Sequence, residues 1–234
     1  DLFNAIADAA RPRLAEFNSQ DLANTAWAFA TAGVEAPGFF GAIADAARPR
    51  LRDFTAQQLA NTAWAFAVVG FNTNRIFEVI AEATRALLGD LDLQSLANTA
   101  WAFACVDSKN AELFSELMGA AAATKCRNDR ALSQLYVVSL YCQLEWPSLS
   151  FPVVESRQAL QAAYRSCEAR PSQLPRDVAA ALNRIGWAHV FEYVTTEGLS
   201  LDMARPDERK AIEVDGPSRY LVNGEGRCVV ENGV

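Results

Sequence analysis

Apolar residues in the first half of the chain recur at helical spacing within three copies of one segment. Leu22–Ala30, Leu59–Ala67 and Leu96–Ala104 all read Leu-Ala-Asn-Thr-Ala-Trp-Ala-Phe-Ala, and equivalent residues are 37 positions apart. A fixed period of this size with a helical apolar pattern is typical of stacked helical repeats. The pattern predicts a mostly α-helical protein, an α-solenoid of helix pairs whose copies start near residues 3, 40, 77 and 114.

The upstream helix of each copy begins at a phenylalanine in the same register, at Phe3, Phe40 and Phe77. Pro12 and Pro49 share one position farther along. Proline lacks the N–H that a helix interior needs, and its ring clashes with the preceding turn. We therefore expect the upstream helix to kink or end at these prolines.

The downstream helix has start and stop signals in register. Asn18, Thr55 and Asp92 occupy one position and are good N-cap residues, because their side-chain oxygens accept from free N–H groups of the first turn. Gly33 and Gly70 lie near its end, where glycine commonly stops a helix. On a helical wheel, one arc of this helix is apolar and predicts a buried face. That arc contains Leu22, Ala23, Ala26, Trp27, Phe29 and Ala30.

Each downstream helix also carries a strip with Gln and Asn four residues apart. These amides are Gln20, Asn24, Gln57, Asn61, Gln94 and Asn98. Two interpretations stay open. In the first, the amides bridge adjacent copies and satisfy polar groups. In the second, they hydrogen-bond unstacked bases of single-stranded RNA, with Thr31, Val68 and Cys105 as the variable residue of each copy.

Three tryptophans, Trp27, Trp64 and Trp101, lie beside this strip, at the edge of the apolar arc. Because a large aromatic side chain contributes strongly to a core, we expect them to be core residues rather than a base-stacking platform.

Arginines form a second column in exact register: Arg11, Arg48 and Arg85. Stacking would align them into a ridge that follows a phosphate backbone. Alternatively, each arginine caps a helix C-terminus or pairs with the acid three positions earlier. Those acids are Asp8, Asp45 and Glu82.

The composition limits the classes of function. The chain has 234 residues and a net charge of −7, and neither half is basic, so any contact with nucleic acid must be local. No apolar run is long enough to cross a bilayer. The five cysteines include no CxxC pair, which argues against a disulfide framework or zinc site and suits a reducing compartment. His189, the only histidine, nearly excludes a multi-histidine metal centre.

The pattern changes twice toward the C-terminal end. Phe114 continues the phenylalanine series, but Leu132–Leu140 replaces the nine-residue motif. We expect a repeat array over residues 1–144 and a proline-containing connector over 145–174. A helix and three short strand-like runs then predict a second, α/β domain over 175–234.

Two segments of that second domain resemble a known family. Gly-Leu-Ser-Leu-Asp-Met-Ala at residues 198–204 and Glu-Val-Asp-Gly-Pro-Ser at 213–218 resemble the RAP domain. The upstream array is similar to the octotricopeptide and heptatricopeptide repeats of the same proteins, many of which act on RNA in mitochondria and chloroplasts. The resemblance implies a small restriction-endonuclease-like fold, truncated here at its C-terminus. It also implies that Asp202, Glu213 and Asp215 could hold a catalytic Mg²⁺.

Three functions follow from the sequence. The preferred one is an organellar RNA-binding protein in RNA processing, stability or translation, which binds single-stranded RNA through the amides and arginines of the array. The alternatives are an Mg²⁺-dependent RNA endonuclease and a protein-binding scaffold without nucleic acid. We expect protein partners but no association with a membrane. We expect no cofactor, except Mg²⁺ if the protein is a nuclease. We also expect a mitochondrial or chloroplast location, with the cytoplasm as the alternative, and a targeting segment and further repeats outside this sequence.

Overall fold

The computed structural model describes residues 2–34, 36–71, 75–125, 128–167, 173–214, 221–222 and 228–229. This part of the chain is mostly helical and forms two compact units, Asp1–Cys167 and Glu168–Val234. None of its helices is both long and apolar enough to span a membrane.

The first unit contains a pair of helices for each copy of the repeat. The first helices are α1 (Leu2–Ala10), α3 (Pro37–Ala47), α5 (Ile76–Ala86) and α7 (Ala111–Ala123). The second helices are α2 (Ser19–Thr31), α4 (Ala56–Val68), α6 (Leu93–Cys105) and α8 (Asp129–Glu145). Each second helix packs on the next, α2 on α4, α4 on α6 and α6 on α8. The predicted two helices per copy are confirmed.

The predicted proline signals are also confirmed. α1 ends at Ala10 and α3 at Ala47, and in each copy the chain continues as a 3₁₀ helix with proline in its first turn, η1 (Arg11–Glu16) and η2 (Arg48–Asp53). The third copy lacks the proline and has only a short 3₁₀ turn, η3 (Leu88–Asp90).

All three predicted N-caps form. Asn18, Thr55 and Asp92 accept from the backbone N–H three residues onward. In the first two copies the reciprocal bond is present too, since Asp21 and Gln58 each accept from the cap residue's N–H at 3.0 Å. These capping boxes fix where α2 and α4 begin.

The second helices end in the same way in three copies. Gly33 and Gly70 have φ of 63° and 65°, and the next residue donates back to a carbonyl five residues earlier. This is a Schellman motif, which needs a left-handed residue. In the third copy Asp107, with φ of 54°, takes the glycine's place, which the sequence did not reveal.

The core of each copy is an aromatic pair. Phe3, Phe40 and Phe77 meet Phe29, Phe66 and Phe103 edge to face, with ring centroids 5.2, 6.1 and 5.3 Å apart. The expected core position of the tryptophans is confirmed in part. Trp64 and Trp101 are half-buried and pack against the core, whereas Trp27 is 46% exposed.

The first unit continues past residue 144. Trp146 packs on Phe114 and on Phe151, with centroid distances of 5.6 and 5.8 Å. Helix α9 (Arg157–Cys167) then packs on α8. These contacts cover the last helix pair.

The second unit begins with α10 (Gln173–Arg184). An antiparallel sheet follows, in the order β1 (Val190–Val194), β2 (Ser200–Arg205) and β3 (Lys210–Ile212), with η4 (Pro206–Glu208) between β2 and β3. A separate pair joins β4 (Leu221–Val222) and β5 (Cys228–Val229). A helix followed by short strands is confirmed, whereas a restriction-endonuclease-like fold stays a prediction.

Replacing Gly70 by alanine should lower the free energy of unfolding by about 1 kcal/mol. The left-handed conformation is less favourable by about this amount for an L-residue with a Cβ atom. Gly89 is the matched control, since an added Cβ meets nothing within 4 Å at either glycine and only Gly70 has positive φ. Urea unfolding of Gly70→Ala and Gly89→Ala measures the difference. Equal stabilities would contradict this account of the helix end.

Candidate nucleic-acid interface

Four side chains of each second helix form one stripe. They are spaced i, i+4, i+7 and i+11, which at 100° per residue places them within roughly 60° of one another. We call this surface the amide–tryptophan stripe. It comprises Gln20, Asn24, Trp27 and Thr31 on α2, Gln57, Asn61, Trp64 and Val68 on α4, and Gln94, Asn98, Trp101 and Cys105 on α6.

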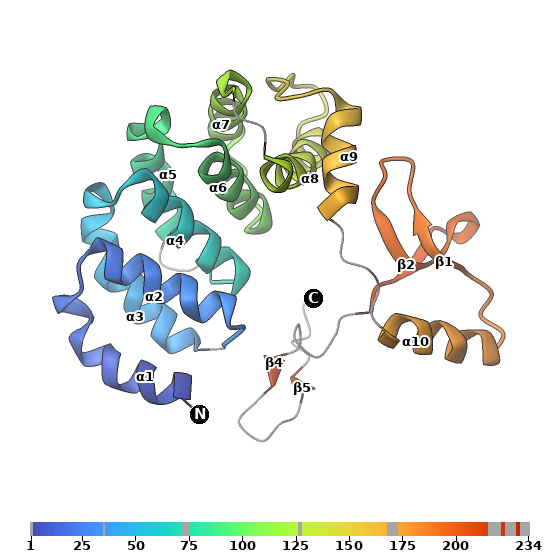
Figure 1. The fold of residues 1–234 in the computed structure, drawn as a ribbon, viewed down its shortest axis with the longest axis horizontal. Helices are drawn as coiled ribbons and strands as arrows, with labels where there is room; N and C mark the ends of the chain where they lie inside the picture. Colours follow the sequence, from blue (N-terminus) through green and yellow to red (C-terminus); the bar gives the residue numbers. More distant parts are fainter. Residues whose placement is uncertain are drawn as a thin grey trace. The chain divides into compact units, whose positions relative to one another are not determined.

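The stripe faces away from the first helices. In Figure 1, α4, α6 and α8 lie on the inner side of the curved row of helices in the first unit, and α5 and α7 lie on its outer side. All four stripe residues of α2 are exposed, and those of α4 and α6 are exposed or half-buried. Because neighbouring second helices pack together, the three sets of side chains follow one another across this surface.

The amides have different roles in different copies. Gln94 Nε2 donates to Asn98 Oδ1 at 2.9 Å and to Gln134 Oε1 at 2.8 Å, and Asn128 Nδ2 donates to Gln94 Oε1 at 3.2 Å. The bonds of Gln94 with Gln134 and Asn128 link α6 to α8, as the bridging interpretation predicts, whereas the bond with Asn98 lies within α6.

The amides of the first two copies, Gln20, Asn24, Gln57 and Asn61, form no side-chain hydrogen bond within the described residues. Their donors and acceptors are therefore free to bind a ligand.

The variable position differs in chemistry from copy to copy. Thr31 offers a hydroxyl group, Val68 a methyl surface and Cys105 a thiol, and all three residues are exposed. Packing around the sulfur raises the pKa of the Cys105 thiol to about 11. At neutral pH it is an uncharged weak donor rather than a reactive thiolate.

The arginine column is not one continuous ridge. Arg48 pairs with Asp45 at 3.3 Å, as the ion-pair alternative predicts. Arg85 pairs with Glu116 at 2.7 Å and Glu112 at 3.2 Å, and the hydrogen bond to Glu116 raises the pKa of Arg85.

Arg11 is exposed and forms no ion pair within the part of the chain that the structure describes. Of the column, Arg11 is therefore the side chain best placed to bind a phosphate.

Two of the three candidate metal ligands lie close together in the second unit. Val214 N–H donates to Asp202 Oδ2 at 2.7 Å, and Asp202 N–H donates to Glu213 Oε1 at 3.3 Å. Asp215 lies outside the described residues. Within the described residues, no group of three or more His, Cys, Asp or Glu side chains could hold a metal ion.

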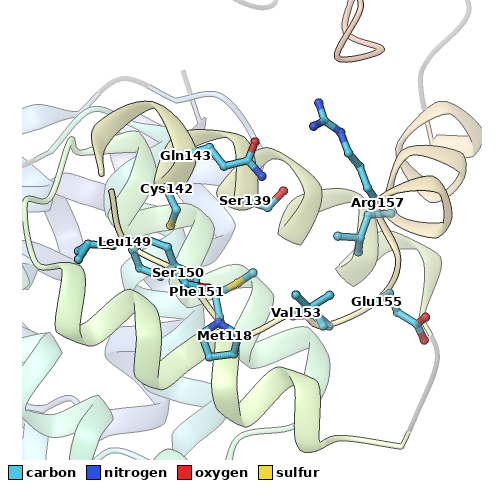
Figure 2. Close-up of a pocket in the computed structure, with 13 residues that line it drawn as sticks. Met118, Ser139, Cys142, Gln143, Leu149, Ser150, Phe151, Val153, Glu155 and Arg157 are labelled. Carbon is cyan, nitrogen blue, oxygen red and sulfur yellow. The ribbon is translucent and has the colours of Figure 1, made fainter. Parts of the chain in front are cut away.

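A cavity of about 290 Å³ lies at the end of the first unit (Figure 2). Met118 of α7, Cys142 of α8 and the segment that leads to α9 line it, while the Arg157 side chain points away. Burial raises the pKa of the Cys142 thiol to about 12. The cavity thus has mainly apolar walls and no ionised nucleophile from this cysteine at neutral pH.

Residues 1–141 match the family model described as RNA-editing substrate-binding complex 6 protein. The match covers more than half of the chain and includes α1 to α7 and most of α8. No curated protein matches the chain.

Substitution of Gln94 by alanine should destabilise the protein by about 1 to 2 kcal/mol, because it removes the partly buried hydrogen bonds between α6 and α8. Gln57→Ala is the matched control, at the same repeat position without such bonds, and should change stability by less than about 0.5 kcal/mol. Urea unfolding followed by circular dichroism compares the two. If Gln57→Ala lowers the free energy of unfolding as much as Gln94→Ala does, the amide bonds between α6 and α8 do not stabilise the protein as described.

Proposed function

Since the chain belongs to the family of RNA-editing substrate-binding complex 6 proteins, we propose that it binds single-stranded RNA within an RNA-editing complex, in association with other proteins. The observation that carries this proposal is the amide–tryptophan stripe. It repeats the same polar and aromatic groups in register along one exposed surface.

The stripe has the groups that single-stranded RNA requires. Stacking of a base on an aromatic side chain is worth about 1 to 3 kcal/mol. Side-chain amides hydrogen-bond the edges of unstacked bases. We assign stacking to Trp27 and Trp64 and base-edge contacts to the free amides of α2 and α4. Arg11, whose guanidinium group lies beside Gly38 of the first helix α3, would contact the phosphate of RNA that extends beyond the stripe. The chain is acidic, with a net charge of −7, so affinity should depend only weakly on salt.

The amides of the third copy and the arginines of the second and third copies have a smaller part in this proposal. Gln94 and Asn98 are already hydrogen-bonded, and Arg48 and Arg85 are ion-paired. We infer that Gln94, Asn98 and Arg85 mainly hold the array in the shape that positions the free side chains of the first two copies.

We further propose that the helix pairs form an α-solenoid of the octotricopeptide type and that the second unit is a RAP-like domain acting as a second RNA contact. We also propose the mitochondrion as its compartment, because this location is compatible with membership of an RNA-editing complex family and the chloroplast is not.

The endonuclease remains a second candidate because Asp202 and Glu213 lie side by side. If it is correct, the protein cleaves single-stranded RNA only with Mg²⁺, and Glu213→Gln abolishes cleavage. Absence of cleavage at high protein concentration would remove this candidate.

Trp27→Ala and Trp64→Ala should each weaken binding of a single-stranded RNA by about tenfold, because each removes one stacking surface. Trp27→Phe and Trp64→Phe are the matched controls and should retain most of the affinity, since phenylalanine still presents an aromatic face. Fluorescence anisotropy of a labelled oligonucleotide measures both. Wild-type affinity in the alanine variants, or no binding by the unmodified chain, would refute RNA binding on this surface and favour a protein scaffold.

A further inference from the structure

A second cavity of about 290 Å³ opens between α5 and the end of α6. Phe77 and Phe103, both buried, form its apolar side together with Ala81. Ser108 and Glu78 line the same cavity, and Asp107 and Lys109 follow the end of α6.

In the second copy of the repeat this place is filled by the chain's own Phe71. The Phe71 ring lies 5.3 Å from the Phe66 ring, and its edge is 3.9 Å from where a Cβ on Gly41 would lie. Thirty-seven residues later, Phe66 corresponds to Phe103, Gly41 to Glu78 and Phe71 to Ser108. The residues of the third copy that correspond to the two neighbours of the Phe71 ring therefore line the cavity. Ser108, which corresponds to Phe71 itself, has no ring to fill it.

The backbone is the same in both copies. Phe71 N–H donates to the Phe66 carbonyl at 2.8 Å, and Ser108 N–H donates to the Phe103 carbonyl at 3.0 Å. The preceding residue, Gly70 or Asp107, is left-handed in each case. The change from phenylalanine to serine thus leaves a space next to Phe103 that matches the place of an aromatic ring.

The charges around the opening disfavour a phosphate. Lys109 Nζ is bound by Asp107 at 2.6 Å and by Glu145 at 2.5 Å, and Arg75 pairs with Glu78 at 2.6 Å. Both cations are therefore already paired, and the three carboxylates outnumber them. A nucleotide would bring more negative charge to this acidic surface, whereas a basic peptide would complement it.

We propose that this cavity binds an aromatic side chain from a basic segment of a partner protein. The ring takes the place that Phe71 has in the second copy and packs on Phe103 and Phe77, and flanking Arg or Lys side chains pair with Glu78 and Asp107. Buried aromatic anchors of this kind dominate many protein interfaces. The proposal does not depend on RNA binding by the amide–tryptophan stripe.

NMR titration of the isotope-labelled chain tests the proposal with three probes: acetyl-Arg-Phe-Arg-amide, acetyl-Arg-Ala-Arg-amide and adenosine monophosphate. The phenylalanine peptide should shift the amide resonances of residues 107–110 and bind about tenfold more tightly than the alanine peptide. Adenosine monophosphate should leave these resonances unchanged. Equal binding of the two peptides would overturn the proposal, as would a shift caused by the nucleotide, which would make this a nucleobase pocket.

Variants at residue 108 provide the second measurement. Ser108→Phe should fill the cavity as Phe71 does, raise the urea midpoint of unfolding and abolish peptide binding, while Ser108→Ala leaves the cavity open and retains binding. Ser108→Val introduces the residue that the first copy has at this position, Val34, and should weaken peptide binding. It replaces Ser108→Phe in the test if the phenylalanine variant does not fold. Full peptide binding by folded Ser108→Phe or Ser108→Val would refute the assignment.

Discussion

Close packing of successive second helices through small side chains is the contact on which the first unit depends. Six alanines of these helices are completely buried: Ala23, Ala26, Ala60, Ala63, Ala97 and Ala100. Small residues let neighbouring helices approach closely, and a larger side chain would force them apart. Because the same alanines recur every 37 residues, each helix meets the next in the same way, and identical exposed side chains come into register.

Because the copies are so regular, the positions at which they differ indicate where individual copies have different roles. Gln94 is bonded to the diverged fourth copy, whereas Gln57 is free. Ser108 leaves a cavity in the third copy at the place that the Phe71 side chain fills in the second copy. In the functions that we propose, one scaffold presents an RNA-binding surface on some copies and a protein-binding pocket on another.

Local chemistry made much of the fold predictable. Prolines, N-caps and glycines act through the few residues around them, so the sequence located the helix ends in the first two copies. Trp27 was misplaced because it lies at the edge of the apolar arc, where the helical wheel alone does not show whether a neighbour covers it.

Partners distant in sequence were harder to predict. Arg85 pairs with Glu116, 31 residues away on α7, and this choice depends on how two helices pack. Asp107 takes a glycine's conformation although aspartate rarely does so. The cavity at Ser108 depends on which side chains of α5 and α6 surround that residue, and the sequence alone does not show them.

The most direct test of the central claim is to map where RNA touches the chain. A single-stranded RNA that carries photoreactive thiouridine would be cross-linked to the protein and the attachment sites identified by mass spectrometry. The account predicts cross-links on α2 and α4, at or next to Trp27 and Trp64. Cross-links confined to the first helices or to residues 173–214 would contradict it.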